Sequence, residues 1–337
     1  MKTNAADSCP DADVYGGQKA GAQGSFQIQA RDIFGNPQDV GGNNFQAVII
    51  GPDGSVIAST VVDNDDGTYD VNYNATKSGR YSVNLALDTD DVCDSPFEAV
   101  VYPGSPSATT SYLVCPTVVA VGRTMELSVQ AVDVFGNYLI QGGDDYVVLV
   151  AGPGVVTPIT EDNADGTYSS TLFATEAGNY TATAYLNGVE VLGSPCYLHV
   201  QTTDYAPEMA FAYGFSNLYS CDRGPSTFSI QTRDSYGNDL QYGGMTFNFT
   251  FVGPSGNYTV DYTVVDNDDG TYDVTWSSPV SGSYYIYISS KGVPLAGSPY
   301  FATLRTGSSS PVYSYAFGPG LSGVQGNEKH HYMIFIH

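Results

Sequence analysis

One unit of sequence occurs three times along this chain of 337 residues, and this repetition limits the fold more than any other feature. Each copy contains an aspartate followed by an aromatic-Gly-Asn sequence, then a Gly-Gly pair, a Gly-Pro pair, Asp-Gly-Thr-Tyr, Gly-x-Tyr and Ser-Pro. The first landmark begins at Arg31, Val132 and Arg233, which are 101 residues apart both times. Roughly 100 residues are enough to bury a core. The sequence therefore predicts a tandem array of small domains.

Within each copy, residues that favour turns separate short runs in which apolar and polar residues alternate. Phe-Gly-Asn and Asp-Gly favour turns because glycine and asparagine reach positive φ at little cost. The run before each Gly-Pro pair alternates apolar and polar residues, with the apolar ones at Phe45, Ala47 and Ile49, at Tyr146, Val148 and Val150, and at Phe247, Phe249 and Phe251. Trp276, the one tryptophan, continues a similar alternation and is expected in a core. About seven short strands in roughly 100 residues predict an all-β, immunoglobulin-like sandwich.

Composition excludes several classes of function. Acidic residues outnumber basic ones 35 to 11, which gives a net charge of −24, and the surface should repel nucleic acids and anionic headgroups. No run approaches the roughly 18 to 20 apolar residues of a membrane-spanning helix. The start also lacks the apolar core of a secretion signal. With 38 glycines, 18 prolines and 27 tyrosines, we expect almost no helix.

Four of these landmarks occur in the same order in all three copies: aromatic-Gly-Asn, Asp-Gly-Thr-Tyr, Gly-x-Tyr and Ser-Pro. In this they resemble the immunoglobulin-like rod repeat of filamins over nearly all of residues 8–305. The resemblance implies tandem sandwiches for mechanical linkage and partner binding, often by a peptide that adds a strand along a sheet edge, and it implies no catalysis. The chain differs from the cytoplasmic actin cross-linkers of that family in having no actin-binding head and in its cysteines and glycosylation sequons.

The landmarks place repeat 1 at residues 8–103, repeat 2 at 107–201 and repeat 3 at 211–305, with short linkers around 104–110 and 202–210. Residues 312–337 resemble the first strands of an incomplete fourth repeat. Two interpretations of this tail remain open: the chain is a fragment of a longer repeat protein, or the two extra strands pair with another molecule.

The sequence contains five cysteines, at Cys9, Cys93, Cys115, Cys196 and Cys221. The first, third and fifth lie at the starts of successive repeats, 106 residues apart, and the other two lie on the expected last strands. Because first and last strands of a sandwich run side by side, we expect disulfides Cys9–Cys93 and Cys115–Cys196. The alternative is that these are small buried thiols that only pack. Repeat 3 has Tyr300 in place of Cys196, which leaves Cys221 unpaired, bonded to a partner, or bonded to sequence outside this chain.

Four glycosylation sequons begin at Asn74, Asn179, Asn248 and Asn257. Such tripeptides also arise by chance in a chain rich in asparagine and threonine. Asn248 alternates with the inward Phe247 and Phe249 and should face outward, whereas Asn74 and Asn257 lie in expected turns. Together with cysteines suited to bridging, these positions favour an extracellular protein.

The acidic runs are the candidates for metal binding. Asp63-Asn64-Asp65-Asp66-Gly67 and its counterparts have the alternating oxygens of calcium loops but no distal glutamate. We interpret them as tight strand connections, with weak calcium binding at Asp63, Asp65, Asp266 and Asp268 as the alternative. No other metal and no cofactor are expected.

Nothing in the sequence indicates an enzyme. The four histidines, His199, His330, His331 and His337, have no nucleophile or carboxylate at a recognisable spacing, and no glycine-rich phosphate loop occurs.

The sequence thus predicts a structural protein: a semi-rigid rod in an extracellular filament, appendage or matrix that binds protein partners or copies of itself through strand edges and domain-end loops. Two alternatives remain. One is an intracellular filamin-like scaffold in the cytoplasmic cytoskeleton that binds peptides by strand addition. The other is the stalk of a cell-surface adhesion receptor.

Overall fold

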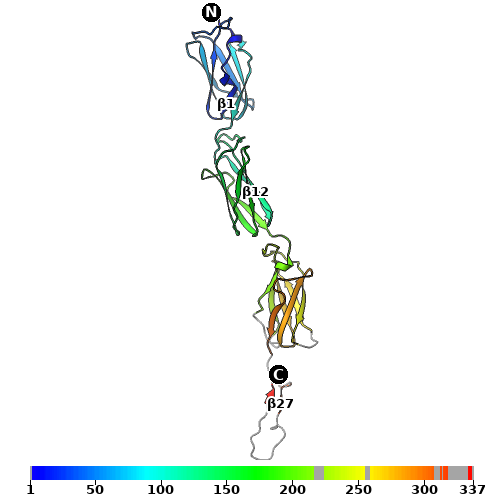
Figure 1. Ribbon diagram of the computed structural model, residues 1–337. Helices are drawn as coiled ribbons and strands as arrows, with labels where there is room; N and C mark the ends of the chain where they lie inside the picture. The colour runs from blue at the N-terminus through cyan, green and yellow to red at the C-terminus, as the bar shows by residue number, and fades with distance from the viewer. Residues whose placement is uncertain are drawn as a thin grey trace, which may run out of the picture. The chain divides into compact units, whose positions relative to one another are not determined.

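A computed structural model of the chain describes residues 2–215, 224–254, 259–306, 312, 314–317 and 333–335 (Figure 1). The chain divides into two compact units. The first consists of Met1–Val119, Arg123–Ala174 and Gly178–Val200, and so contains repeats 1 and 2. The second consists of Ala120–Gly122, Thr175–Ala177 and Gln201–His337, and contains repeat 3.

Each repeat is a β-sandwich, which confirms the all-β, immunoglobulin-like prediction (Figure 1). The helical segments of the described residues are three short 3₁₀ helices, η1 (Ala5–Asp7), η2 (Ala12–Tyr15) and η3 (Pro207–Met209). In these ranges no helix has the length and apolarity needed to cross a lipid bilayer.

Repeat 1 has two sheets. The first sheet has the order β2 (Gln23–Gln29), β6 (Thr68–Asn74), β5 (Ser59–Asp63). The second has the order β1 (Gly16–Lys19), β9 (Phe97–Tyr102), β7 (Gly79–Leu87), β3 (Phe45–Ile50), β4 (Val56–Ile57), and β8 (Asp90–Asp91) also pairs with β7. The β1–β9 pair is parallel and the other pairs are antiparallel.

Repeat 2 repeats this plan. Its first sheet has the order β10 (Tyr112–Val114), β12 (Thr124–Gln130), β15 (Thr167–Phe173), β14 (Ile159–Asp162). Its second has the order β11 (Val118–Ala120), β18 (Cys196–Gln201), β16 (Gly178–Leu186), β13 (Tyr146–Ala151), with β17 (Val189–Glu190) on β16.

Repeat 3 is built in the same way. One sheet has the order β19 (Phe211–Tyr213), β20 (Ser226–Gln231), β23 (Thr271–Ser277), β22 (Asp261–Asp266). In the other, β24 (Gly282–Ser290) pairs with β21 (Asn248–Val252), β25 (Val293–Pro294) and β26 (Tyr300–Leu304). In the tail, β27 (Tyr315–Phe317) pairs with β28 (Met333–Phe335).

The cores follow the predicted alternation. In β6 the side chains of Tyr69, Val71 and Tyr73 are buried while the residues between them are more exposed, because successive strand residues point to opposite faces. Trp276 is 1% exposed and packs edge-on against Tyr284, at 5.3 Å between ring centroids. The tryptophan is therefore a core residue of repeat 3, as predicted.

The Asp-Gly-Thr-Tyr sequence forms a turn with the same hydrogen bonds in each repeat. Asp66 Oδ1 accepts hydrogen bonds from the backbone N of Thr68 (2.9 Å) and from its hydroxyl (2.6 Å). Gly67 has a φ of 85°, and a Cβ at this position would overlap the carbonyl of Gln38. The same bonds and the same close approach recur at Asp165 and Asp269. This turn explains the recurrence of the motif in all three repeats.

Candidate interaction surfaces and covalent bonds

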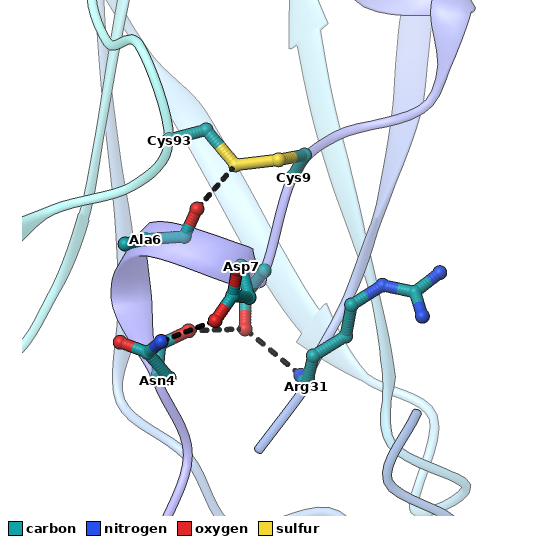
Figure 2. The surroundings of a disulfide bond; sticks show 7 residues. Asn4, Ala6, Asp7, Cys9, Arg31 and Cys93 are labelled. Atoms are coloured by element: carbon teal, nitrogen blue, oxygen red, sulfur yellow. Dashed lines mark hydrogen bonds between the residues drawn. A yellow bond between two sulfur atoms is a disulfide. The ribbon is translucent and has the colours of Figure 1, made fainter. Parts of the chain in front are cut away.

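Repeats 1 and 2 each contain one disulfide, which closes a loop that spans most of the repeat. Cys9 is bonded to Cys93 across 84 residues, and Cys115 to Cys196 across 81. Figure 2 shows the first, with Cys93 Sγ 3.3 Å from the carbonyl oxygen of Ala6; a disulfide sulfur has no hydrogen to donate, so this is a packing contact. Asn4 N donates a hydrogen bond to Arg31 O at 2.7 Å, which holds the N-terminal segment beside this disulfide.

The two disulfides are not at equivalent positions, although Cys9 and Cys115 begin successive repeats. In repeat 1, Pro10 pairs with Ile28, so Cys9 lies opposite Gln29. Gln130 is the counterpart of Gln29 in repeat 2, and the residue opposite Gln130 is Tyr112 and not Cys115. The equal spacing of 106 residues therefore does not reflect structural equivalence.

The prediction that Cys93 lies on the last strand is wrong. It occupies a turn before β9, with a φ of 47°, while Cys196 is the first residue of its strand. The turn places the side chain beside the N-terminal segment, because Cys93 N donates to Ala5 O at 3.2 Å.

Repeat 3 has an aromatic stack on the strand that carries Cys196 in repeat 2. Tyr300, at the start of β26, stacks on Phe215 at 5.1 Å between centroids, and Phe215 stacks on Phe228 at 4.6 Å. The Tyr300 hydroxyl also accepts a hydrogen bond from Ala212 N at 2.9 Å. Offset aromatic pairs add roughly 0.5–1.5 kcal/mol beyond their buried area. This stack links the first and last strands where repeat 2 has a covalent bond. Cys221 lies outside the described residues.

Three of the four sequon asparagines lie in the described part of the chain, and all three are exposed. Asn74 ends β6, Asn179 is the second residue of β16 and Asn248 begins β21. The side chain of Asn179 is engaged, with Oδ1 2.9 Å from Nδ1 of His199 on the neighbouring strand. Asn257 lies outside the described residues, as do His330, His331 and His337. Asn74 and Asn248 are thus open to a glycosyltransferase, and their use as acceptors stays a prediction.

Two of the aspartates considered as calcium ligands, Asp63 and Asp266, accept hydrogen bonds from backbone N–H groups and so hold a loop in place. Asp63 Oδ2 accepts from Gly42 N at 2.6 Å and Oδ1 from Asp65 N at 2.9 Å, while Asn43 N donates to the Tyr69 hydroxyl at 2.9 Å. Asp266 does the same for Gly244 and Asp268. Among the described residues no group of three or more His, Cys, Asp or Glu side chains is placed to hold a metal. These bonds give the aspartates a role in positioning the chain before β3 and β21.

The turn aspartates give a pH-dependent contribution to stability. The hydroxyl and N–H of Thr271 donate to Asp269 and lower the pKa of that carboxyl. A lowered pKa stabilises the fold above the unfolded value near 3.9, and this contribution is lost as pH falls through the folded value. We expect the urea midpoint of repeat 3, followed by Trp276 fluorescence, to fall between pH 5 and about pH 3, and to fall less in Asp269→Asn. An equal fall in both proteins would contradict this role.

Strands β13 of repeat 2 and β21 of repeat 3 are among the edge strands of the described sheets. In the described residues β13 has β16 as its sheet neighbour and β21 has β24, whereas β3 in repeat 1 is also paired at its end with β4. The outward side chains of β13, Val147 and Leu149, are apolar and exposed. Tyr146 anchors this strand: its hydroxyl lies 2.8 Å from Ser111 Oγ, and burial raises its pKa to about 12. An open edge offers unpaired backbone groups to an added strand.

The sequence did not determine which strand edge is available to a partner. The alternation around Tyr146 and Val148 predicted the inward residues of β13, but the edge position depends on pairing between residues that are far apart in the sequence. The apolar outward residues Val147 and Leu149 were the available signal, because an outward face of a wet sheet is normally polar.

The repeats match models of known protein families. The filamin/ABP280 repeat model matches residues 8–98 and 205–301, together more than half of the chain, and the model of invasin domain 3 matches residues 107–196. Filamin-C of Mus musculus is 28% identical over 269 residues, which cover 76% of this chain and 9% of that protein. Filamin-A of Drosophila melanogaster is 26% identical over 301 residues, covering 85% and 13%.

Among solved structures, the Escherichia coli adhesin FdeC shares the fold, with a TM-score of 0.55 and 18% sequence identity over 90% of this chain and 99% of that chain. The chain spans about a tenth of the length of the filamins that it matches.

Proposed function

Because the chain belongs to the filamin repeat family, we propose that it is a non-catalytic structural segment whose tandem sandwiches act as a semi-rigid rod outside the cell and bind protein partners. The observation that carries this proposal is the pair of disulfides in repeats 1 and 2, since such bonds form and persist in oxidising compartments. The exposure of Asn74 and Asn248 supports it.

The short connection between repeats 1 and 2 supports the semi-rigid character. Pro106 pairs with Asp133, and Ser107 N donates to Val132 O at 2.9 Å, so the residues after the connection join repeat 2 directly. Proline-containing connections of this length bend less than Gly/Ser linkers.

The decisive experiment is mass spectrometry of the unreduced protein from its native source. We expect Cys9–Cys93 and Cys115–Cys196 as linked peptides, and glycan on Asn74 or Asn248. Five free thiols with unmodified asparagines would overturn the extracellular proposal.

A second candidate function is an intracellular scaffold that binds peptides by strand addition, as the curated filamin relatives and the open edge of β13 favour. Its test is a Val150→Pro variant. Asn187 N donates to Asp145 O, and hydrogen-bonded pairs alternate along an antiparallel ladder, so the N–H of Val147 faces β16 and that of Val150 faces the open edge, where proline is tolerated. Loss of a partner peptide from this variant, with binding retained by a Val61→Pro control on the edge of β5, would support strand addition at β13.

A further inference from the structure

Two of the sequons lie on strands and have the same surroundings on their sheets. In repeat 3, Asn248 and Thr250 lie on β21, and Thr250 pairs with Tyr287 of β24. Residues two positions apart on a strand share a face, so Asn248 is a diagonal neighbour of Tyr287. Diagonal neighbours are roughly 7–8 Å apart, within reach of a long side chain. All three residues are exposed.

Repeat 2 has this arrangement on different strands. Asn179 and Thr181 lie on β16, and Thr181 pairs with Tyr197 of β18, so Asn179 is a diagonal neighbour of Tyr197. Tyr197 is 72% exposed. Asn179 Oδ1 lies 2.9 Å from His199 Nδ1, whereas the atom that accepts a sugar is Nδ2. In both repeats an exposed tyrosine therefore lies beside the asparagine of the sequon.

The sequon of repeat 1 has different surroundings. On β2 the residue opposite Asn74 is Gln23, and the diagonal one is Ser25. The outward side of β6 next to it carries Asn72. A tyrosine diagonal to the asparagine is thus a property of the two sequons on β16 and β21.

Tyr287 belongs to an aromatic face on repeat 3. Val252 pairs with Tyr285, and Tyr285 pairs with Phe301, with 5.6 Å between the two ring centroids. These three side chains and Tyr287, which we call the aromatic face, are between 47% and 56% exposed. The outward face of a wet sheet is normally polar, so an apolar face of this kind marks a contact surface.

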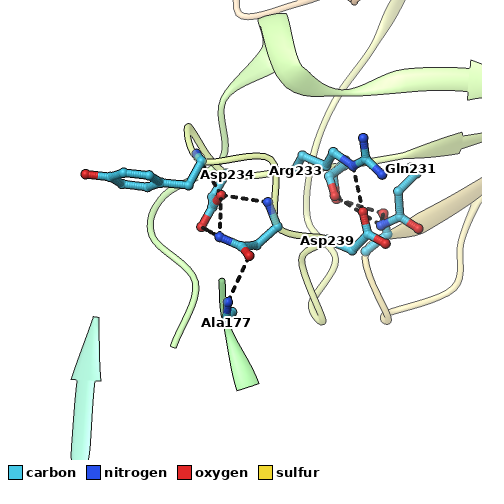
Figure 3. A network of polar contacts seen from close by, with 9 residues as sticks. Ala177, Gln231, Arg233, Asp234 and Asp239 are labelled. Carbon is cyan, nitrogen blue, oxygen red and sulfur yellow. Dashed lines mark hydrogen bonds and ion pairs between the residues drawn. The ribbon is translucent and has the colours of Figure 1, made fainter. Parts of the chain in front are cut away.

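Elsewhere in repeat 3 an aromatic ring is covered by the protein itself. The guanidinium carbon of Arg233 lies 4.5 Å from the centroid of the Phe211 ring, and Phe211 is half-buried. Arg233 is held there by Asp239, since Arg233 Nε donates to Asp239 Oδ1 at 2.7 Å (Figure 3). A cation in this position is attracted by the negative face of the ring. Tyr197 and Tyr287 remain exposed and are suited to a ligand from outside the polypeptide.

A sugar has the chemistry that these tyrosines require. A pyranose ring has a face of C–H groups, which the negative face of an aromatic ring attracts. A neutral sugar is not repelled by the net charge of −24, whereas a second copy of this chain carries the same charge. A sugar bonded to Asn248 is also held beside Tyr287, so the contact forms without the entropic cost of association.

We propose that Tyr287 and Tyr197 bind the first sugar ring of glycans attached to Asn248 and Asn179. Attachment joins Asn Nδ2 to the anomeric carbon of an activated sugar diphosphate; the amide loses a proton and the diphosphate leaves. The bound glycan covers part of the sheet and stabilises the repeat, because the contact exists only when the two strands are paired. The proposal deepens the proposed extracellular function and rests on it.

Nuclear magnetic resonance of the full chain, secreted from a eukaryotic cell line with isotope-labelled sugars, tests the contact. We expect the ring protons of the first sugar on Asn248 to shift upfield, because they lie over an aromatic ring. Tyr287→Ala should remove this shift. Phe301→Ala is the matched control, since Phe301 belongs to the aromatic face but lies on β26, away from β21, and should leave the shift in place.

Urea unfolding followed by Trp276 fluorescence measures the stabilisation of repeat 3. Loss of the glycan in Asn248→Gln should raise the unfolding equilibrium constant at least about twofold, the lower end for an aromatic contact. The same substitution in a Tyr287→Ala background should have no such effect. The same four proteins made in a bacterial periplasm, without sugar, correct for the effects of the substitutions themselves.

Three results would overturn the proposal. The first is a sugar on Asn248 whose protons do not change in Tyr287→Ala, and the second is a secreted protein with no sugar on Asn248. The third is association of the glycosylated parent that Tyr287→Ala abolishes, which would show that a second copy covers the aromatic face. The host glycosylates the secreted protein, so these results are independent of the native-source test, in which unmodified asparagines and free thiols overturn the extracellular function.

Discussion

Reduction of the protein is expected to destabilise repeats 1 and 2 by about 2–5 kcal/mol each and to leave repeat 3 unchanged. Each disulfide closes a loop of more than 80 residues, and opening it increases the conformational entropy of the unfolded chain. Repeat 3 has instead the stack of Tyr300 on β26, Phe215 just after β19 and Phe228 on β20, which a thiol reagent does not affect.

The single tryptophan makes this prediction directly measurable. Trp276 is buried in repeat 3, so its fluorescence follows that repeat alone, whereas circular dichroism follows all three. With dithiothreitol, the dichroism transition should move to lower urea concentration while the fluorescence transition stays in place. A Cys221→Ser background prevents thiol exchange, and a Tyr300→Ala variant should shift the fluorescence transition in both redox states. Movement of the fluorescence transition on reduction of the parent would show that the stabilities of the repeats are coupled.

Replacement of Gly270 by alanine is expected to destabilise repeat 3 by about 2–5 kcal/mol. The φ of 88° alone costs an L-residue about 1–2 kcal/mol. The new Cβ would also overlap the carbonyl of Leu240, which is backbone and must shift, adding about 1–3 kcal/mol.

Gly292→Ala is the matched control, because Gly292 has a similar φ of 78° and no heavy atom within 4 Å of the added Cβ. It should cost only the conformational part, about 1–2 kcal/mol. Urea unfolding followed by Trp276 fluorescence compares the two, and equal losses would show that the approach to Leu240 contributes nothing.

Local sequence patterns were sufficient to predict most of the fold. The alternation through Tyr69, Val71 and Tyr73 and the Asp-Gly turn before it are properties of adjacent residues, and both appear as expected. The position of Cys93 could not be predicted, because a residue with a φ of 47° in a turn has no distinguishing sequence signal.

The interaction surfaces were less accessible to sequence reasoning. The motif ending in Asn137 was recognised as a turn, but its bonds to Thr76 and Ser78 join residues about 60 positions apart. The edge position of β13 likewise depends on which strands pair across the sandwich. Both features depend on tertiary geometry, which a repeat pattern does not specify.

The unequal distribution of disulfides has a mechanical consequence. When a chain is pulled from its ends, the residues between two bonded cysteines carry no tension. The segment between Cys9 and Cys93, whose sequence separation is 84, therefore cannot lengthen even after repeat 1 unfolds. At about 3.5 Å per extended residue, this bond withholds roughly 290 Å of contour length. The described residues of repeat 3 contain no such bond, and its strands are free to extend. Under load, repeats 1 and 2 act as covalently limited links and repeat 3 as the extensible element.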